Sequence, residues 1–165
     1  VPTPFAYTGP ASPETVLCMP NGAMSLRART LLLSLPSALR SKLGIVSVRV
    51  LCPWDDVALR EAVPTSVQTI RVVEEAFSST DGAIYSNTLE SVLSGAFAEQ
   101  VPNVQSLVRA PGQHIGLAAW DEILQAQPRL AGSCLKESLA WTSKAKAAMT
   151  PRGEGQNPSP GKTLL

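Results

Sequence analysis

The sequence is short of charged residues. Asp, Glu, Lys and Arg make up 16% of the 165 residues, whereas about 25% is usual for soluble domains. The formal net charge is only +1, so there is no electrostatic footprint for nucleic acid or anionic lipid. Because charges are depleted at the centres of interfaces, this composition favours a surface that a partner partly covers. The alternative is a small domain whose loops are rich in uncharged polar residues.

Histidine is almost absent, which limits the possible catalytic chemistry. His114 is the only one, so any Ser-His-Asp or Cys-His arrangement would have to use it. It lies in a predicted loop, where no recognisable motif places a nucleophile beside it, and a single histidine also argues against a zinc enzyme. We therefore expect no catalytic, cofactor-binding or metal-binding residue in this chain.

Cysteines are few and their number is odd. Cys18, Cys52 and Cys134 show no paired spacing, which argues against a disulfide framework or a zinc site and favours a reducing, cytoplasmic setting. Cys18 and Cys52 end two predicted strands that should be neighbours. They are either buried, inert thiols or a reactive pair at the edge of a sheet.

Glycine-rich phosphate-binding loops and long apolar runs are missing as well. The turn at Asn21-Gly22 has one glycine where a dinucleotide fingerprint needs three, and Gly161-Lys162-Thr163 lacks the earlier glycine of a phosphate-binding loop, since position 156 is Gln156. No apolar run approaches the roughly 20 residues of a membrane span. The first ten residues do not read as a signal peptide. We expect neither a nucleotide site nor a membrane segment.

The sequence does contain a regular alternation of strand and helix patterns. Short β-branched runs predict strands over residues 15–19, 45–51, 67–73 and 104–108, and helical spacing predicts helices over 23–35, 56–62, 83–97, 117–127 and 135–149. The first helix could extend over 38–43 and end at Gly44. The alternation predicts an α/β fold with three layers, in which helices cover both faces of a mainly parallel sheet.

The composition of the sequence divides the chain into three predicted segments. Residues 1–13, rich in proline, are predicted to be an extended lead-in, residues 14–149 a single α/β domain, and residues 150–165 a flexible tail rich in Pro and Gly.

Candidate side chains lie at the predicted strand ends. Glu74 and Glu75 are adjacent carboxylates, but adjacent strand residues point to opposite faces, so we expect a partly paired Glu74 and a solvated Glu75. Trp54 and Trp120 are predicted to pack in the core or at an interface. Trp54 should contact the first turn of a neighbouring helix.

The segment from Gly44 to Trp54 carries a family resemblance. A glycine, a β-rich strand with an arginine, and Pro-Trp are followed by a short helix over 55–62, a Val63-Pro64 step and the strand 69–73. This pattern resembles the transketolase C-terminal-like fold and, more closely, the second domain of pyruvate:ferredoxin oxidoreductases. Over residues 15–124 it is most similar to the central domain of the flavoprotein (α) subunit of fungal-type NADPH sulfite reductase.

The resemblance implies a scaffold or docking domain of a larger oxidoreductase in sulfur assimilation. Its partners would be neighbouring domains or subunits, and FAD, FMN and NADPH would bind elsewhere in the parent enzyme. Pyruvate enzymes of this kind commonly have an Asp-Arg pair and a Lys-Glu-Pro-Gly-like loop, where this chain has residues 74–78. Two alternatives remain open, a domain of a pyruvate oxidoreductase and a small thiol-based enzyme or regulator.

Overall fold

The structure, a computed structural model, describes residues 3–78, 82–98, 100–112 and 115–124. The chain divides into two units, Val1–Gln127 and Pro128–Leu165, and all the described residues belong to the first. His114, Cys134, the predicted helix 135–149 and the predicted tail, with its Gly161-Lys162-Thr163 motif, lie outside the described residues.

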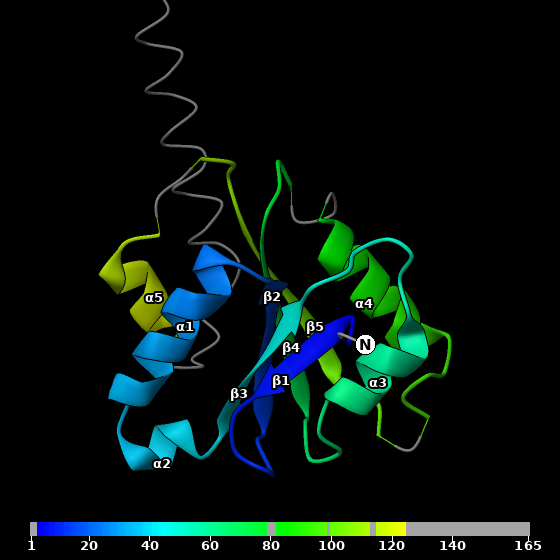
Figure 1. The fold of residues 1–165 in the computed structure, drawn as a ribbon, viewed down its shortest axis with the longest axis horizontal. Helices are drawn as coiled ribbons and strands as arrows, with labels where there is room; N and C mark the ends of the chain where they lie inside the picture. Colours follow the sequence, from blue (N-terminus) through cyan, green and yellow to red (C-terminus); the bar gives the residue numbers. More distant parts are fainter. Residues whose placement is uncertain (1–2, 79–81, 99, 113–114, 125–165) are drawn as a thin grey trace, which may run out of the picture. The chain divides into compact units, whose positions relative to one another are not determined.

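Five strands form one sheet (Figure 1). They are β1 (Phe5–Thr8), β2 (Thr15–Pro20), β3 (Leu43–Val48), β4 (Thr69–Glu75) and β5 (Asn103–Arg109). Their order is β1-β3-β2-β4-β5, with β2 to β5 parallel and β1 antiparallel to β3. The predicted α/β class and the parallel central strands are confirmed.

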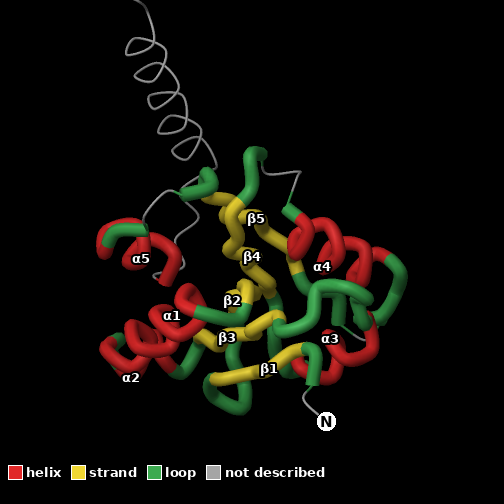
Figure 2. The backbone as a smooth tube through the Cα atoms, turned by 45° about the horizontal axis from the view of Figure 1, so that its top comes forward, coloured by secondary structure: helices red, strands yellow, loops and turns green. Residues whose placement is uncertain are grey.

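Helices lie on both sides of this sheet (Figure 2). They are α1 (Ala23–Ser34), α2 (Ser37–Arg40), α3 (Asp56–Ala62), α4 (Ala83–Leu93) and α5 (Leu117–Leu124). The two figures place α1 and α5 on one face and α3 and α4 on the other. No helix in the described ranges is long and apolar enough to cross a membrane.

Local signals explain where the helices begin and end. Asp55 caps α3, because its side chain accepts a hydrogen bond of 2.8 Å from the backbone N–H of Ala58. α4 ends before Gly95, whose φ of +89° is left-handed. The amides of Gly95 and Ala96 donate to the carbonyls of Val92 and Ser91, which is the Schellman pattern. The helix therefore stops short of the predicted end at residue 97.

The core has two parts, one on each face of the sheet, because the central strands are buried on both sides. Along β2, Val16 and Cys18 belong to the cluster that packs under α3 and α4, while Leu17 and Met19 belong to the cluster under α1 and α5. All four side chains have 0% exposure. A strand of this kind carries an unbroken apolar run, which is why the pattern over residues 15–19 identifies it.

Two predictions about the first part of the chain are wrong. Residues 5–8 fall within the predicted lead-in, but they form strand β1 and pair with β3 from Phe5 opposite Val48 to Thr8 opposite Ile45. Gly44 does not end a helix. It lies inside β3, where a Cβ atom would come within 2.5 Å of the Tyr7 ring.

Candidate functional site

The carboxyl edge of the parallel strands is the usual ligand-binding position in a sheet of this kind. β2 leads into α1 on one face of the sheet, whereas its neighbour β4 leads into α4 on the opposite face. In open α/β sheets, ligands bind beyond the strand ends at such a switch in direction. The described residues that leave this edge are Asn21 and Gly22, the 49–55 loop, residues 76–78 and residues 110–112.

Glu74 fills the position between β4 and the start of α4. The residue is 5% exposed, and its carboxylate accepts two backbone hydrogen bonds, from the N–H of Ile84 at 3.0 Å and from the N–H of Tyr85 at 2.8 Å. A negative charge at this end of a helix is stabilised by the helix dipole. Glu74 is therefore engaged within the fold.

Glu75 does not work with Glu74 as an acid–base pair. It is exposed and lies opposite Arg109 in the sheet register. Its carboxylate accepts a long hydrogen bond of 3.4 Å from the N–H of Gly112. Since successive strand residues point to opposite faces, the two carboxylates do not converge on one reacting group.

The two described cysteines sit in different environments. Cys18 is buried in the core, and this burial raises the pKa of its thiol to about 12. The nearby Thr88 hydroxyl lowers that pKa and the Glu74 carboxylate raises it, both by less than burial does. Cys52 is exposed in the loop after β3. Both thiols are free, and β2 and β3 are neighbours, but one cysteine lies in the core and the other at the surface.

Trp54 connects the loop after β3 to two other elements. Its ring is half-buried and meets Phe5 of β1 edge to face, with ring centroids 4.9 Å apart at an interplanar angle of 75°. Its indole N–H donates to the Ser91 hydroxyl at 2.9 Å, and Ser91 in turn bonds the Asp56 carboxylate. Ser91 is in the last turn of α4, whereas the sequence predicts a contact of Trp54 with the first turn of a helix.

Trp120 belongs to the core on the other face of the sheet. It lies in α5, is 2% exposed and packs with the cluster under α1 and α5. That face also holds a buried arginine, Arg71 of β4, whose Nε donates to the side-chain oxygen of Gln105 at 3.1 Å. Burial lowers the pKa of Arg71. The sequence pattern does not distinguish this arginine from the surface ones.

Four exposed apolar side chains lie on segments that leave the carboxyl edge, although others, such as Leu33 and Leu93, lie elsewhere. Sequence reasoning missed these four. Phe77 follows β4 and is 91% exposed, Leu26 in the first turn of α1 is 66% exposed, and Val50 and Leu51 after β3 are 38% and 44% exposed. The only sequence signal is a large aromatic residue within a predicted loop, at Phe77.

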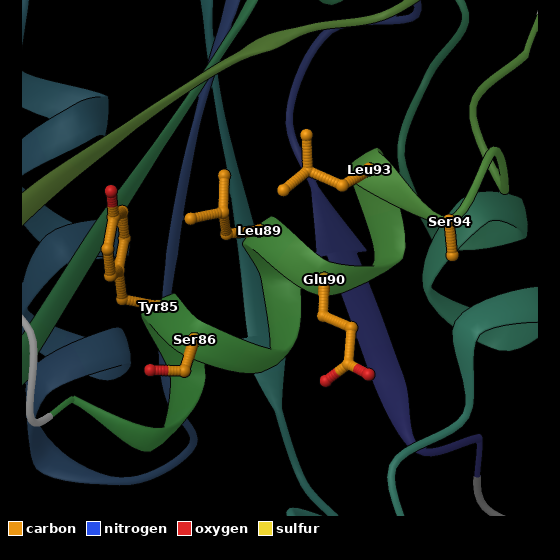
Figure 3. A pocket seen from close by; sticks show the side chains of 6 residues that line it. All are labelled: Tyr85, Ser86, Leu89, Glu90, Leu93 and Ser94. Atoms are coloured by element: carbon orange, nitrogen blue, oxygen red, sulfur yellow. The ribbon is translucent and has the colours of Figure 1, made fainter.

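A hollow runs along α4 (Figure 3). Tyr85, Leu89 and Leu93, one turn apart, point to the same side of the helix. The hollow has a volume of about 540 Å³, and the described residues that line it all come from α4 and its C-cap, Ser94. It is an open surface along one helix and contains one ionisable carboxylate, Glu90.

Neither a metal-binding group among the described residues nor similarity to other proteins points to a function. Within residues 3–78, 82–98, 100–112 and 115–124, no three His, Cys, Asp or Glu side chains are placed to hold a metal ion. Comparison with models of protein families and with curated proteins finds no match for this chain.

Proposed function

We propose that this chain is a non-catalytic docking domain of a multidomain oxidoreductase. The proposed parent is the flavoprotein subunit of a cytoplasmic, assimilatory NADPH sulfite reductase, on the strength of the resemblance carried by residues 44–54 and 69–73. The FAD, FMN and NADPH of such an enzyme would bind on its other domains. For the fold we propose the three-layer, transketolase C-terminal-like arrangement, which the two core clusters on opposite faces of the sheet support.

The observation that carries the docking role is the exposure of apolar side chains where a ligand would be expected. Phe77, at 91% exposure, and Leu26, at 66%, stand on segments that leave the carboxyl edge. Burial of such side chains against a partner is favourable by about 1.5–3 kcal/mol each, and aromatic anchors dominate the energetics of interfaces. The low charge of the chain, 16%, agrees with a surface that a partner covers.

Two of the chemical groups near this edge are poorly placed for catalysis. The Glu74 carboxylate is bound to two backbone amides, and burial holds the pKa of Cys18 at about 12, so that its reactive thiolate form is scarce at neutral pH. A reacting group needs to be accessible and free to move a proton or attack a substrate. The Glu74 carboxylate and the Cys18 thiol are neither accessible nor free to react in this way.

A docking experiment tests the proposal on the parent protein. Phe77→Ser in the intact subunit should weaken the association of this domain with its neighbours, measured by limited proteolysis at the domain junctions. Leu33→Ser is the matched control, because Leu33 is 71% exposed but lies near the far end of α1. Equal effects of the two substitutions would contradict a docking role for the carboxyl edge.

Cofactor binding gives a second test. Titration of the 165-residue chain with FAD, FMN or thiamine diphosphate should show no tight binding, and stoichiometric binding of any of them would contradict the proposal. Assay of the intact protein with sulfite and NADPH, against pyruvate and coenzyme A, separates the sulfite reductase from the pyruvate oxidoreductase alternative.

The thiol alternative now rests on Cys52, which is exposed. Rapid alkylation of Cys52 by iodoacetamide below neutral pH would indicate a lowered thiol pKa and favour that alternative. Slow alkylation of both Cys18 and Cys52 favours the docking domain.

A further inference from the structure

Charged residues differ between the helices on the two faces of the sheet. Residues 15–54, which include α1 and α2, contain no Asp or Glu. Their basic residues are Arg27, Arg29, Arg40, Lys42 and Arg49. On the opposite face (Figure 2), the acidic residues of α3 and α4 are Asp56, Glu61 and Glu90. Arg60 is the only basic residue in these two helices. α1 and α2 therefore form a basic surface, and α3 and α4 an acidic one.

The basic surface also exposes an apolar side chain. Leu33 of α1 is 71% exposed, and Arg27 of α1 and Arg40 of α2 are exposed as well. The Arg40 guanidinium donates a long hydrogen bond of 3.4 Å to the carbonyl of Leu33, so charge and apolar surface adjoin at the end of α1. α5, the other helix on this face, contains Asp121 and Glu122. The basic surface is therefore confined to α1 and α2.

The acidic surface is hollowed along α4. Tyr85, Leu89 and Leu93 line the hollow of about 540 Å³, one turn apart (Figure 3). Leu93 is 77% exposed, and Glu90 contributes the one carboxylate among the described lining residues. Glu61 of the neighbouring helix α3 is exposed too. An apolar strip flanked by carboxylates is suited to receive a helix that carries apolar and basic side chains together.

The two surfaces complement each other. α1 has 12 residues and α4 has 11, so the two helices match in length. One offers Leu33 beside arginines, and the other an apolar hollow beside carboxylates. Complementary charges around an apolar contact speed association and fix its register. Because the surfaces lie on opposite faces of the sheet (Figure 2), they can meet only between two copies of the chain.

We propose that a second copy of this chain occupies the α4 hollow with its basic surface. Leu33 of one copy is then buried against Leu93 of the other, and Arg27 lies close to Glu90. Each copy keeps one free surface of either kind, so the contact is head-to-tail and extends into short stacks, in contrast to a closed symmetric pair. The inference goes beyond the docking function and does not rest on it, since neither surface includes Phe77.

Sedimentation velocity on the 165-residue chain is the first test. At low salt the average sedimentation coefficient should rise steadily with protein concentration. In about 0.5 M sodium chloride it should fall back toward the value of the monomer, because salt screens exposed charges. A chain that stays monomeric into the millimolar range at low salt would overturn the proposal and assign the α4 hollow to a different partner.

Two double variants, each altering one surface, test the head-to-tail geometry. Arg27→Ser/Leu33→Ser removes the basic surface, and Glu90→Gln/Leu93→Ser removes the acidic one. All four positions are exposed, so both variants should keep a Tm close to that of the parent chain. Alone, each should self-associate at least about tenfold more weakly than the parent.

An equimolar mixture of the two variants should recover association. Each variant supplies the surface that the other lacks, so the mixture should form a one-to-one pair that does not extend further. A mixture that stays monomeric, or undiminished association of either variant alone, would overturn the proposal.

Glu75→Gln/Val101→Ser is the matched control. It removes an exposed carboxylate and an apolar side chain of 67% exposure that lie outside both surfaces. It should associate as the parent chain does, with the same dependence on salt. A loss as large as in the other two variants would show that association depends on general surface character and would overturn the specific contact.

Discussion

The indole N–H of Trp54 donates a hydrogen bond of 2.9 Å to the hydroxyl of Ser91. This bond joins the loop after β3 to the last turn of α4. Ser91 is fully buried and also bonds Asp56 at the start of α3. One hydroxyl thus connects the loop to the two helices on this face of the sheet.

Truncation of Trp54 should destabilise the domain. Trp54→Ala should lower the free energy of unfolding by about 2–3 kcal/mol, because it removes an aromatic pair, a hydrogen bond and part of the apolar burial. Trp54→Phe keeps the ring contact with Phe5 and should lose about 1 kcal/mol. Urea melts measure both. In a double-mutant cycle, the losses in Trp54→Phe and Ser91→Ala should be less than additive, and full additivity would count against a shared bond.

The cap of α3 should depend on the side-chain oxygen of Asp55. Asp55→Ala should lower the free energy of unfolding by about 1 kcal/mol, since the N–H of Ala58 loses its acceptor. Asp55→Asn retains an oxygen and should lose much less. Urea melts measure the free energy of unfolding of both variants. Equal losses in Asp55→Ala and Asp55→Asn would mean that the charge of Asp55, and not its hydrogen bond to Ala58, stabilises the start of α3.

The parts of the fold that were predictable are those with local causes. The apolar run of β2 and the capping aspartate of α3 depend on neighbours in sequence, and both are where the pattern placed them. β1 was missed because its pairing partner, β3, lies about 40 residues away and its flanking prolines indicate a linker. Gly44 was misread because a glycine after a helical pattern has two local meanings, a helix end or a close approach by another segment.

The candidate site was less predictable because it depends on contacts between different segments of the chain and not on local sequence. Glu74 was recognised as a strand-end carboxylate, but its acceptor role depends on how the chain returns from β4 to the start of α4. The exposure of Phe77 is a property of the surface, and neither periodicity nor composition reports it. Cys18 is buried and Cys52 is exposed because β3 ends at Val48, before Cys52. The β-rich sequence pattern continues past Val48 and therefore does not show where the strand ends.

Gly44 should be intolerant of a side chain. Gly44→Ala places a methyl group against the Tyr7 ring, and overpacking of this kind destabilises by about 1–3 kcal/mol. Tyr7→Ala removes the obstruction, so the same glycine substitution should be much milder in that background. Thermal melts of the two single variants and the double variant test the coupling. An equal loss in both backgrounds would show that the strain comes from the backbone.

Alkaline pH should destabilise the folded chain in a window set by Cys18. Its thiol has an ordinary pKa of 9.0, and burial raises the pKa to about 12 in the folded chain. Between these values the unfolded chain has lost the proton while the folded chain keeps it, so deprotonation favours unfolding. The stabilisation is complete below pH 9.0 and is lost as the pH rises toward about 12. Burial raises the pKa of Tyr7 from 10.0 to about 12, which acts in the same direction.

The contribution of Cys18 can be isolated by substitution. Cys18→Ala should be less stable at neutral pH, because it leaves a small cavity, but its free energy of unfolding should fall less steeply with pH above 9.0 than that of the parent chain. Cys52→Ala, which alters an exposed thiol, should follow the parent profile and is the matched control. Urea melts across the alkaline range provide the slopes. A Cys18→Ala slope as steep as that of the parent would assign the alkaline loss to other groups, with Tyr7 the first to be tested by Tyr7→Phe.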